Sequence, residues 1–197
     1  MSIIAVIAKY KEDISWVNQL KCPYIVYDKS NDIPNVGRES ETYLRYIIAN
    51  YEKLPNYILF LQGHPFDHLT IRTVDYINES IDKILDNNID FLHLNNLHHE
   101  PHNKYTRTKE SFIALFNHTL PNIFIFPPGA QFIVSRDSIL SRSKEFYQTI
   151  SNVMSKINNT SVSFKNCLVC PWTIERMWSY IFNKSIINNN ISYDDLL

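Results

Sequence analysis

Runs of consecutive apolar residues constrain the fold of this chain more than any other feature of its sequence. They cover residues 3–8, 24–27 and 57–61, and residues 91–94, which include His93, predict a further strand. In the early runs, apolar side chains do not alternate with polar ones, which is typical of strands in a sheet that helices cover on both faces. Segments with helical periodicity, residues 37–51 and 75–86, lie between the runs. The alternation predicts an α/β/α sandwich with a mixed, mostly parallel sheet.

The second half of the chain continues this pattern less regularly. We expect two further strands and two further helices, over residues 123–126, 131–134, 144–157 and 173–182. The polar, histidine-rich residues 98–109 lack periodicity and predict a loop. We therefore expect a single domain over residues 1–183, followed by a polar tail over residues 184–197.

Composition narrows the classes of protein that fit. With 197 residues and 45% hydrophobic content, the chain can bury one sizeable core. A formal net charge of −1 provides no basic surplus for nucleic acid. Three cysteines do not form a disulfide framework, and no apolar segment is long enough for a signal peptide or a membrane span. We expect a cytoplasmic protein with no membrane span and no nucleic-acid partner.

The stretch F-L-Q-G-H-P, residues 60–65, ends one of the apolar runs. Ligands bind beyond the carboxyl ends of strands in such sheets, so Gln62, Gly63 and His64 are candidates for a ligand site. Gly63 permits a close backbone approach or a positive φ. His64 could act as a base, or bind a divalent cation together with Asp67 and His68. The alternative is a tight turn without metal.

A second candidate loop ends in N-V-G-R-E, residues 35–39, where a helix begins. Free backbone N–H groups at a helix N-terminus and the planar guanidinium of Arg38 could hold a phosphate, with Asn35 and Gly37 shaping the turn. The alternative is an asparagine cap with a solvated arginine. His98, His99 and His102 form a third group, which could be a metal cluster or a mobile lid.

Two late motifs complete the set of candidates. Gln131 lies in G-A-Q-F, where small residues could make room for a ligand or form a bend between strands. Glu175 and Trp178 form E-x-x-W, which suits a general base beside a sugar-stacking indole, or a first-turn acid on an ordinary helix. No nucleophile elbow, Walker loop, G-x-G-x-x-G or H-E-x-x-H is present.

These motifs in this order resemble an uncharacterised domain-of-unknown-function family of fungi, bacteria and large DNA viruses. The resemblance spans about residues 3–183 and rests chiefly on F-L-Q-G-H-P and G-A-Q-F. More distantly, the chain is similar to glycosyltransferases of the GT-A fold, in which a strand of this kind ends in a metal-binding Asp-x-Asp. Here Gln62-Gly63-His64 stands at that place instead.

The second resemblance implies transfer of a sugar from a nucleotide-sugar donor to a glycan or other hydroxyl acceptor. It implies Glu175 and His64 as catalytic residues and Trp178 and Trp172 as acceptor-binding residues. The donor-binding residues that it implies are Asp28, Asn35, Gly37, Arg38, Gln62, Gly63 and Gln131. The resemblance leaves open whether the protein uses a metal cofactor. The candidates are Mn²⁺ and Mg²⁺, with His64 and Asp67 as the ligands. The alternatives are a non-catalytic carbohydrate- or nucleotide-binding module and a histidine-based metallohydrolase.

Overall fold

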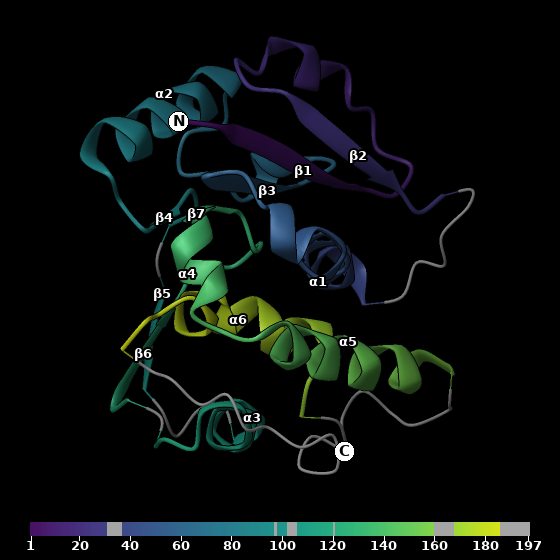
Figure 1. Cartoon of the computed structure of the whole chain (residues 1–197), viewed down its shortest axis with the longest axis vertical. Helices are drawn as coiled ribbons and strands as arrows, with labels where there is room; N and C mark the ends of the chain where they lie inside the picture. The colour runs from purple at the N-terminus through teal and green to yellow at the C-terminus, as the bar shows by residue number, and fades with distance from the viewer. Residues whose placement is uncertain (31–36, 97, 102–105, 120, 160–167, 186–197) are drawn as a thin grey trace.

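A computed structural model describes residues 1–30, 37–96, 98–101, 106–119, 121–159 and 168–185 (Figure 1). The strands are β1 (Ile3–Lys9), β2 (Tyr24–Asp28), β3 (Tyr57–Gln62), β4 (Phe91–His93), β5 (His98–Pro101), β6 (Ile123–Phe126) and β7 (Phe132–Ser135). The α-helices are α1 (Arg38–Asn50), α2 (Val74–Asn87), α3 (Thr106–Phe116), α4 (Arg136–Leu140), α5 (Lys144–Asn159) and α6 (Pro171–Ile181).

The main sheet has five strands in the order β2-β1-β3-β7-β4. β1 pairs in parallel with both β2 and β3, whereas β7 runs antiparallel to both β3 and β4. Four of the five strands therefore point the same way, and their carboxyl ends lie at one edge of the sheet. The expected α/β class with a mixed sheet is confirmed.

Helices cover both faces of this sheet because its strands are apolar on both sides. In β1, Ala5 and Ile7 pack into a cluster that includes α2, whereas Val6 packs into a larger cluster with α1, α5 and α6. Figure 1 shows α2 on one side of β1 and β3, and α1 on the other. The uninterrupted apolar runs are thus explained by two cores, one on each face.

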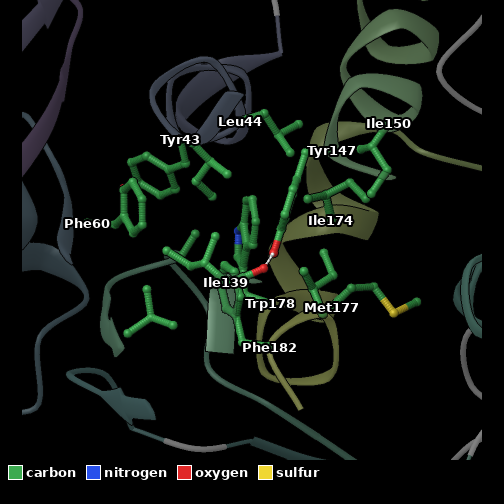
Figure 2. Close-up of a cluster of buried hydrophobic side chains, with 14 of the residues drawn as sticks. Tyr43, Leu44, Phe60, Ile139, Tyr147, Ile150, Ile174, Met177, Trp178 and Phe182 are labelled. Atoms are coloured by element: carbon green, nitrogen blue, oxygen red, sulfur yellow. Dashed lines mark hydrogen bonds between the residues drawn. The ribbon is translucent and has the colours of Figure 1, made fainter. Parts of the chain in front are cut away.

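Aromatic rings dominate the larger core. Trp178 on α6 lies 5.9 Å from the ring of Tyr43 on α1 and stacks on Phe182 at 5.6 Å between ring centroids. Figure 2 shows these rings between the two helices, with Phe60 of β3 beside Tyr43. Such contacts hold α1 and α6 against the sheet and so position the N-termini of both helices.

Within the segment predicted as a loop over residues 98–109, residues 98–101 and 106–109 are structured instead, and residues 102–105 lie outside the described residues. β5 pairs antiparallel with β6 in a separate two-stranded sheet, and α3 begins at Thr106. α3 buries Phe112, Leu115 and Phe116, which are spaced three and four residues apart on one face of the helix. The loop prediction was wrong for residues 106–109 because they are polar, and the apolar residues that show the helical periodicity of α3 come only after Lys109.

Candidate functional site

A pocket of about 380 Å³ opens at the carboxyl edge of the parallel strands, beside the N-terminus of α1. Its size is within the usual range for small-molecule sites. Parallel strands bring their following loops to one edge, so residues distant in sequence meet there. The pocket is lined by Ala8, Lys9, Tyr10, Glu12, Lys29, Arg38, Glu39, Gln62, His64, Asp67 and His68. Arg38, Gln62, His64 and Asp67 are thus brought together from the residues expected at the site.

The loops after β1 and β3 are locked together around Gly63. The Gly63 N–H donates to the Ala8 carbonyl at 2.8 Å, and the buried Trp16 Nε1 donates to the Gly63 carbonyl at 2.9 Å. A Cβ on Gly63 would lie 3.2 Å from the Lys9 Cα, a tight contact with backbone, and 2.7 Å from the flexible end of the Glu12 side chain. Of the two reasons considered for this glycine, the structure shows the close backbone approach.

Two consecutive residues start α1 in the left-handed backbone region. Gly37 has φ 68° and Arg38 has φ 51°. A Cβ on Gly37 would lie 2.5 Å from the Met154 sulfur, so only glycine fits there. A left-handed arginine costs on the order of 1–2 kcal/mol, and such strain gathers at functional sites. Asn35, the other expected member of this turn, lies outside the described residues.

The Arg38 side chain lies at the rim of the pocket. It is about half exposed, its Nε is 3.7 Å from a carboxylate oxygen of Glu39, and its guanidinium lies 5.5 Å from the ring centre of Trp172. Trp172 is 43% exposed, so its indole could also contact a ligand. Arg38 is therefore a cation that can reach the pocket while resting on an aromatic surface.

Behind the rim, a buried ion cluster ties the loop after β2 to α1. Lys29 Nζ lies 2.9 Å from Glu41, and Arg45 Nε donates to the same carboxylate at 2.8 Å. Lys29 also donates to the Arg38 carbonyl. Burial lowers the pKa of Lys29, and the negative charge of Glu41 opposes that shift. The cluster anchors the strained backbone of Arg38.

Glu39 is a pocket residue that the sequence analysis did not single out. Its side chain is only 6% exposed, yet it lines the pocket. Burial raises the pKa of Glu39 and the charge of Glu175 raises it further, whereas a hydrogen bond from its own backbone N–H and the charges of Arg38 and Lys29 oppose the shift. An acid in the first turn of a helix is common, so the sequence carried no signal that set Glu39 apart.

His64 and Asp67 form a loose, exposed pair at the mouth of the pocket. Their Nε2 and Oδ1 atoms are 3.6 Å apart, and both side chains are more than half exposed. Among the described residues, no group of three or more histidine, cysteine or acidic side chains is arranged to hold a metal ion. The side chains of His98 and His99, and all of His102, lie outside that description.

Asp28 was expected to bind the donor, but its carboxylate already has partners within the protein. Its carboxylate pairs with Lys9 and accepts from the Ser30 N–H at 2.9 Å. The Lys9 hydrogen bond and those from Ser30 lower the pKa of Asp28 to about 2. Asp28 does not line the pocket, but it holds Lys9, which does.

The motifs G-A-Q-F and E-x-x-W form one structural unit beside the pocket. The Gly129 N–H donates to Glu175 Oε1 at 2.6 Å. Gln131 is fully buried, and its Nε2 donates to the Pro65 carbonyl at 3.0 Å and to Asn95 Oδ1 at 3.2 Å. Neither Glu175 nor Gln131 lines the pocket. The expectation that Gln131 faces a sugar is corrected: this amide ties three loops together.

Trp178 also requires correction. Its side chain is 1% exposed and packs within the aromatic core, so it offers no surface to an acceptor (Figure 2). The spacing in E-x-x-W placed Trp178 one turn from Glu175, but the apolar stripe of α6 turns the indole inward. Of the two tryptophans assigned to the acceptor, only Trp172 is exposed.

The turn at Gly129 provides a first prediction. Gly129→Ala should lower the free energy of unfolding by about 1–3 kcal/mol, because φ is 93° and a Cβ would lie 2.7 Å from His68 Cβ. Ala130→Gly is the matched control, since Ala130 also has positive φ, at 46°, and should stay within about 1 kcal/mol of wild type. Urea denaturation measures both, and equal stability of the two variants would contradict the expected strain.

Comparison with known proteins places the whole site within one family. The family model described as "Protein of unknown function (DUF3431)" matches two overlapping segments, residues 4–86 and 70–193. No curated protein sequence matches the chain significantly. Within the described residues, no helix is both long and apolar enough to cross a membrane.

Proposed function

Because the chain belongs to the DUF3431 family, whose description assigns no activity, we propose a function from the residues that line the pocket. We propose that the protein is a sugar-nucleotide-dependent glycosyltransferase. The observation that carries the proposal is that Gln62 and His64, at the end of β3, line one pocket together with Arg38, at the start of α1. This arrangement supports the more distant resemblance to GT-A glycosyltransferases, which we retain as part of the proposal.

In the proposed complex, Arg38 binds the donor diphosphate. Its guanidinium is planar and about half exposed, and it can present two parallel N–H groups to a phosphate. Lys9 and Lys29 line the same pocket and add positive charge, although each already pairs with a carboxylate. Fixed cations of this kind stabilise a leaving diphosphate without reorganisation.

His64 and Asp67 are the residues that would hold Mn²⁺ or Mg²⁺ if the reaction uses a metal. Their side chains are exposed and separated by 3.6 Å, so both could turn toward a cation bridging the diphosphate. An imidazole suits Mn²⁺ better than Mg²⁺, which favours Mn²⁺ at this pair. The metal would neutralise negative charge on the leaving group.

The acceptor is a glycan or another hydroxyl compound in this proposal. Trp172 offers an exposed indole at the rim, beside Arg38, on which a sugar ring could stack.

Cys22 and Cys170, the free cysteines of the described part, are buried thiols, which suits a protein of the cytoplasm.

Binding of nucleotide sugars is the direct test. The melting temperature should rise with at least one of UDP-glucose, UDP-N-acetylglucosamine, UDP-xylose or GDP-mannose, measured with and without Mn²⁺. A donor at one hundred times its Kd stabilises the fold by about 2.7 kcal/mol. Donor hydrolysis to free nucleotide would then separate an enzyme from a carbohydrate- or nucleotide-binding module. A tightly bound zinc or iron with no response to nucleotides would favour the metallohydrolase instead.

Arg38→Ala should weaken donor binding about tenfold or more, because a charge-assisted hydrogen bond to phosphate contributes roughly 1.5–3 kcal/mol. Arg136→Ala is the matched control. Arg136 is similarly exposed and lies 3.9 Å from its own neighbouring acid, Asp137, but it lines a different pocket. Isothermal titration calorimetry of both variants with the nucleotide sugar measures their donor affinities. Equal donor affinities would remove Arg38 from the site.

A further inference from the structure

Glu39 differs from the other pocket carboxylates in being buried while still facing the pocket. Its side chain is 6% exposed, whereas that of Asp67 is 70% exposed. Among the described residues, no other residue donates a hydrogen bond to the Glu39 carboxylate, and its nearest ionic partner is Arg38 Nε at 3.7 Å. A buried carboxylate with so few partners is costly, unless a ligand completes its hydrogen bonds.

A second observation points to the same place. One turn along α1, the Tyr43 hydroxyl is fully buried and has no hydrogen-bond partner among the described residues. Burial raises the pKa of Tyr43, and the nearby negative charges of Glu39 and Glu175 raise it further. Near Glu39 there is thus a buried hydroxyl without a hydrogen-bond partner in the described part of the chain, and Glu39 itself has only its own backbone N–H and Arg38 as favourable close neighbours.

We infer that Glu39 is the base that takes the proton of the acceptor hydroxyl in the proposed glycosyl transfer. The acceptor oxygen attacks C1 of the donor sugar as its proton passes to a Glu39 oxygen. The bond between C1 and the diphosphate oxygen breaks, and the departing diphosphate keeps the electron pair beside Arg38. This inference rests on the proposed function and names the proton acceptor at the same site.

The surroundings of Glu39 suit a base better than an acid. The charged and titratable groups facing it are Arg38 and Tyr43 on α1, Glu175 on α6 and Lys29 after β2. The raised pKa of Glu39, caused first by burial and then by Glu175, makes its carboxylate more basic than an exposed one. A diphosphate is a good leaving group and needs no proton donor.

Glu175 is less suited to this role than the sequence had suggested. One of its oxygens already accepts the Gly129 N–H at 2.6 Å, and the residue lies outside the pocket lining. Its charge instead raises the pKa of Glu39 through space. Glu175 is thus a positioning residue, which holds the Gly129 turn through a hydrogen bond and raises the pKa of Glu39 through its charge.

The test uses the full-length protein, the nucleotide sugar that stabilises it most, and water as the acceptor. Glu39→Gln should lower kcat for donor hydrolysis 10²- to 10⁴-fold, the usual contribution of a general base, and leave the donor Kd within about twofold. The exposed Glu52→Gln is the matched control and should keep wild-type kcat. A Glu39→Gln variant that binds donor and retains kcat would overturn the inference and leave the glycosyltransferase proposal standing.

The pH profile gives a readout that does not depend on how well Glu39→Gln folds. Wild-type kcat should fall on the acidic side with a midpoint above 4.5, the ordinary pKa of glutamate. Glu175→Gln keeps an oxygen for the Gly129 N–H but removes a charge, so the midpoint should move to lower pH. A wild-type profile without that acidic limb, or loss of turnover only in Glu175→Gln, would overturn the inference. Failure of wild type to bind any nucleotide sugar would overturn both proposals.

Discussion

Replacing Arg142 by methionine should lower the free energy of unfolding by about 3 kcal/mol, because a buried guanidinium caps the end of α6. Arg142 has no exposed surface, and its Nε donates to the Ile181 carbonyl at 2.9 Å. Its guanidinium also lies about 5.3 Å from the ring centres of Phe116 and Phe146. Methionine fills similar volume but removes the guanidinium donor from the Ile181 carbonyl at the helix end.

Urea denaturation with an unchanged m-value measures this effect. Arg136→Met is the control, since Arg136 is exposed and should change stability by less than about 0.5 kcal/mol. A loss below 1 kcal/mol in Arg142→Met would show that water or other groups satisfy the helix end as well as the guanidinium does.

Trp178→Ala should destabilise the protein by about 3–5 kcal/mol, because it opens a cavity in the centre of the larger core. The indole contacts the rings of Tyr43 and Phe182 (Figure 2). It also contacts the ring of Phe132. Trp178→Phe should cost much less than Trp178→Ala, since it keeps a ring and the buried Nε1 has no hydrogen-bond partner among the described residues.

Trp172→Ala completes the comparison. Trp172 is 43% exposed, so its loss should change stability by about 0.5 kcal/mol or less while weakening contacts at the pocket rim. Thermal and urea unfolding of the three variants provide the measurement. If Trp178→Ala kept its stability and lost only acceptor affinity, the sequence-based assignment of Trp178 to the acceptor would be correct after all.

The carboxyl edge of the sheet could be predicted as the place of the site, because strand direction follows from the apolar runs. Gln62 and His64 follow β3, and Arg38 opens α1; all three line the pocket as that reasoning required. Glu39 could not be singled out, because its burial depends on α1, α6 and the loop after β2 meeting around it. The same holds for Gln131, whose partners are 66 and 36 residues away.

The sequence by itself determined the strands of the main sheet, most of the helices and the edge of the sheet at which the pocket lies. These depend on local periodicity, which reports which side of an element avoids water. Tertiary structure alone decided which glutamate faces the pocket and that residues 98–101 pair with β6. The reason is that such properties depend on contacts between segments distant in the chain, and periodicity within one segment carries no information about them.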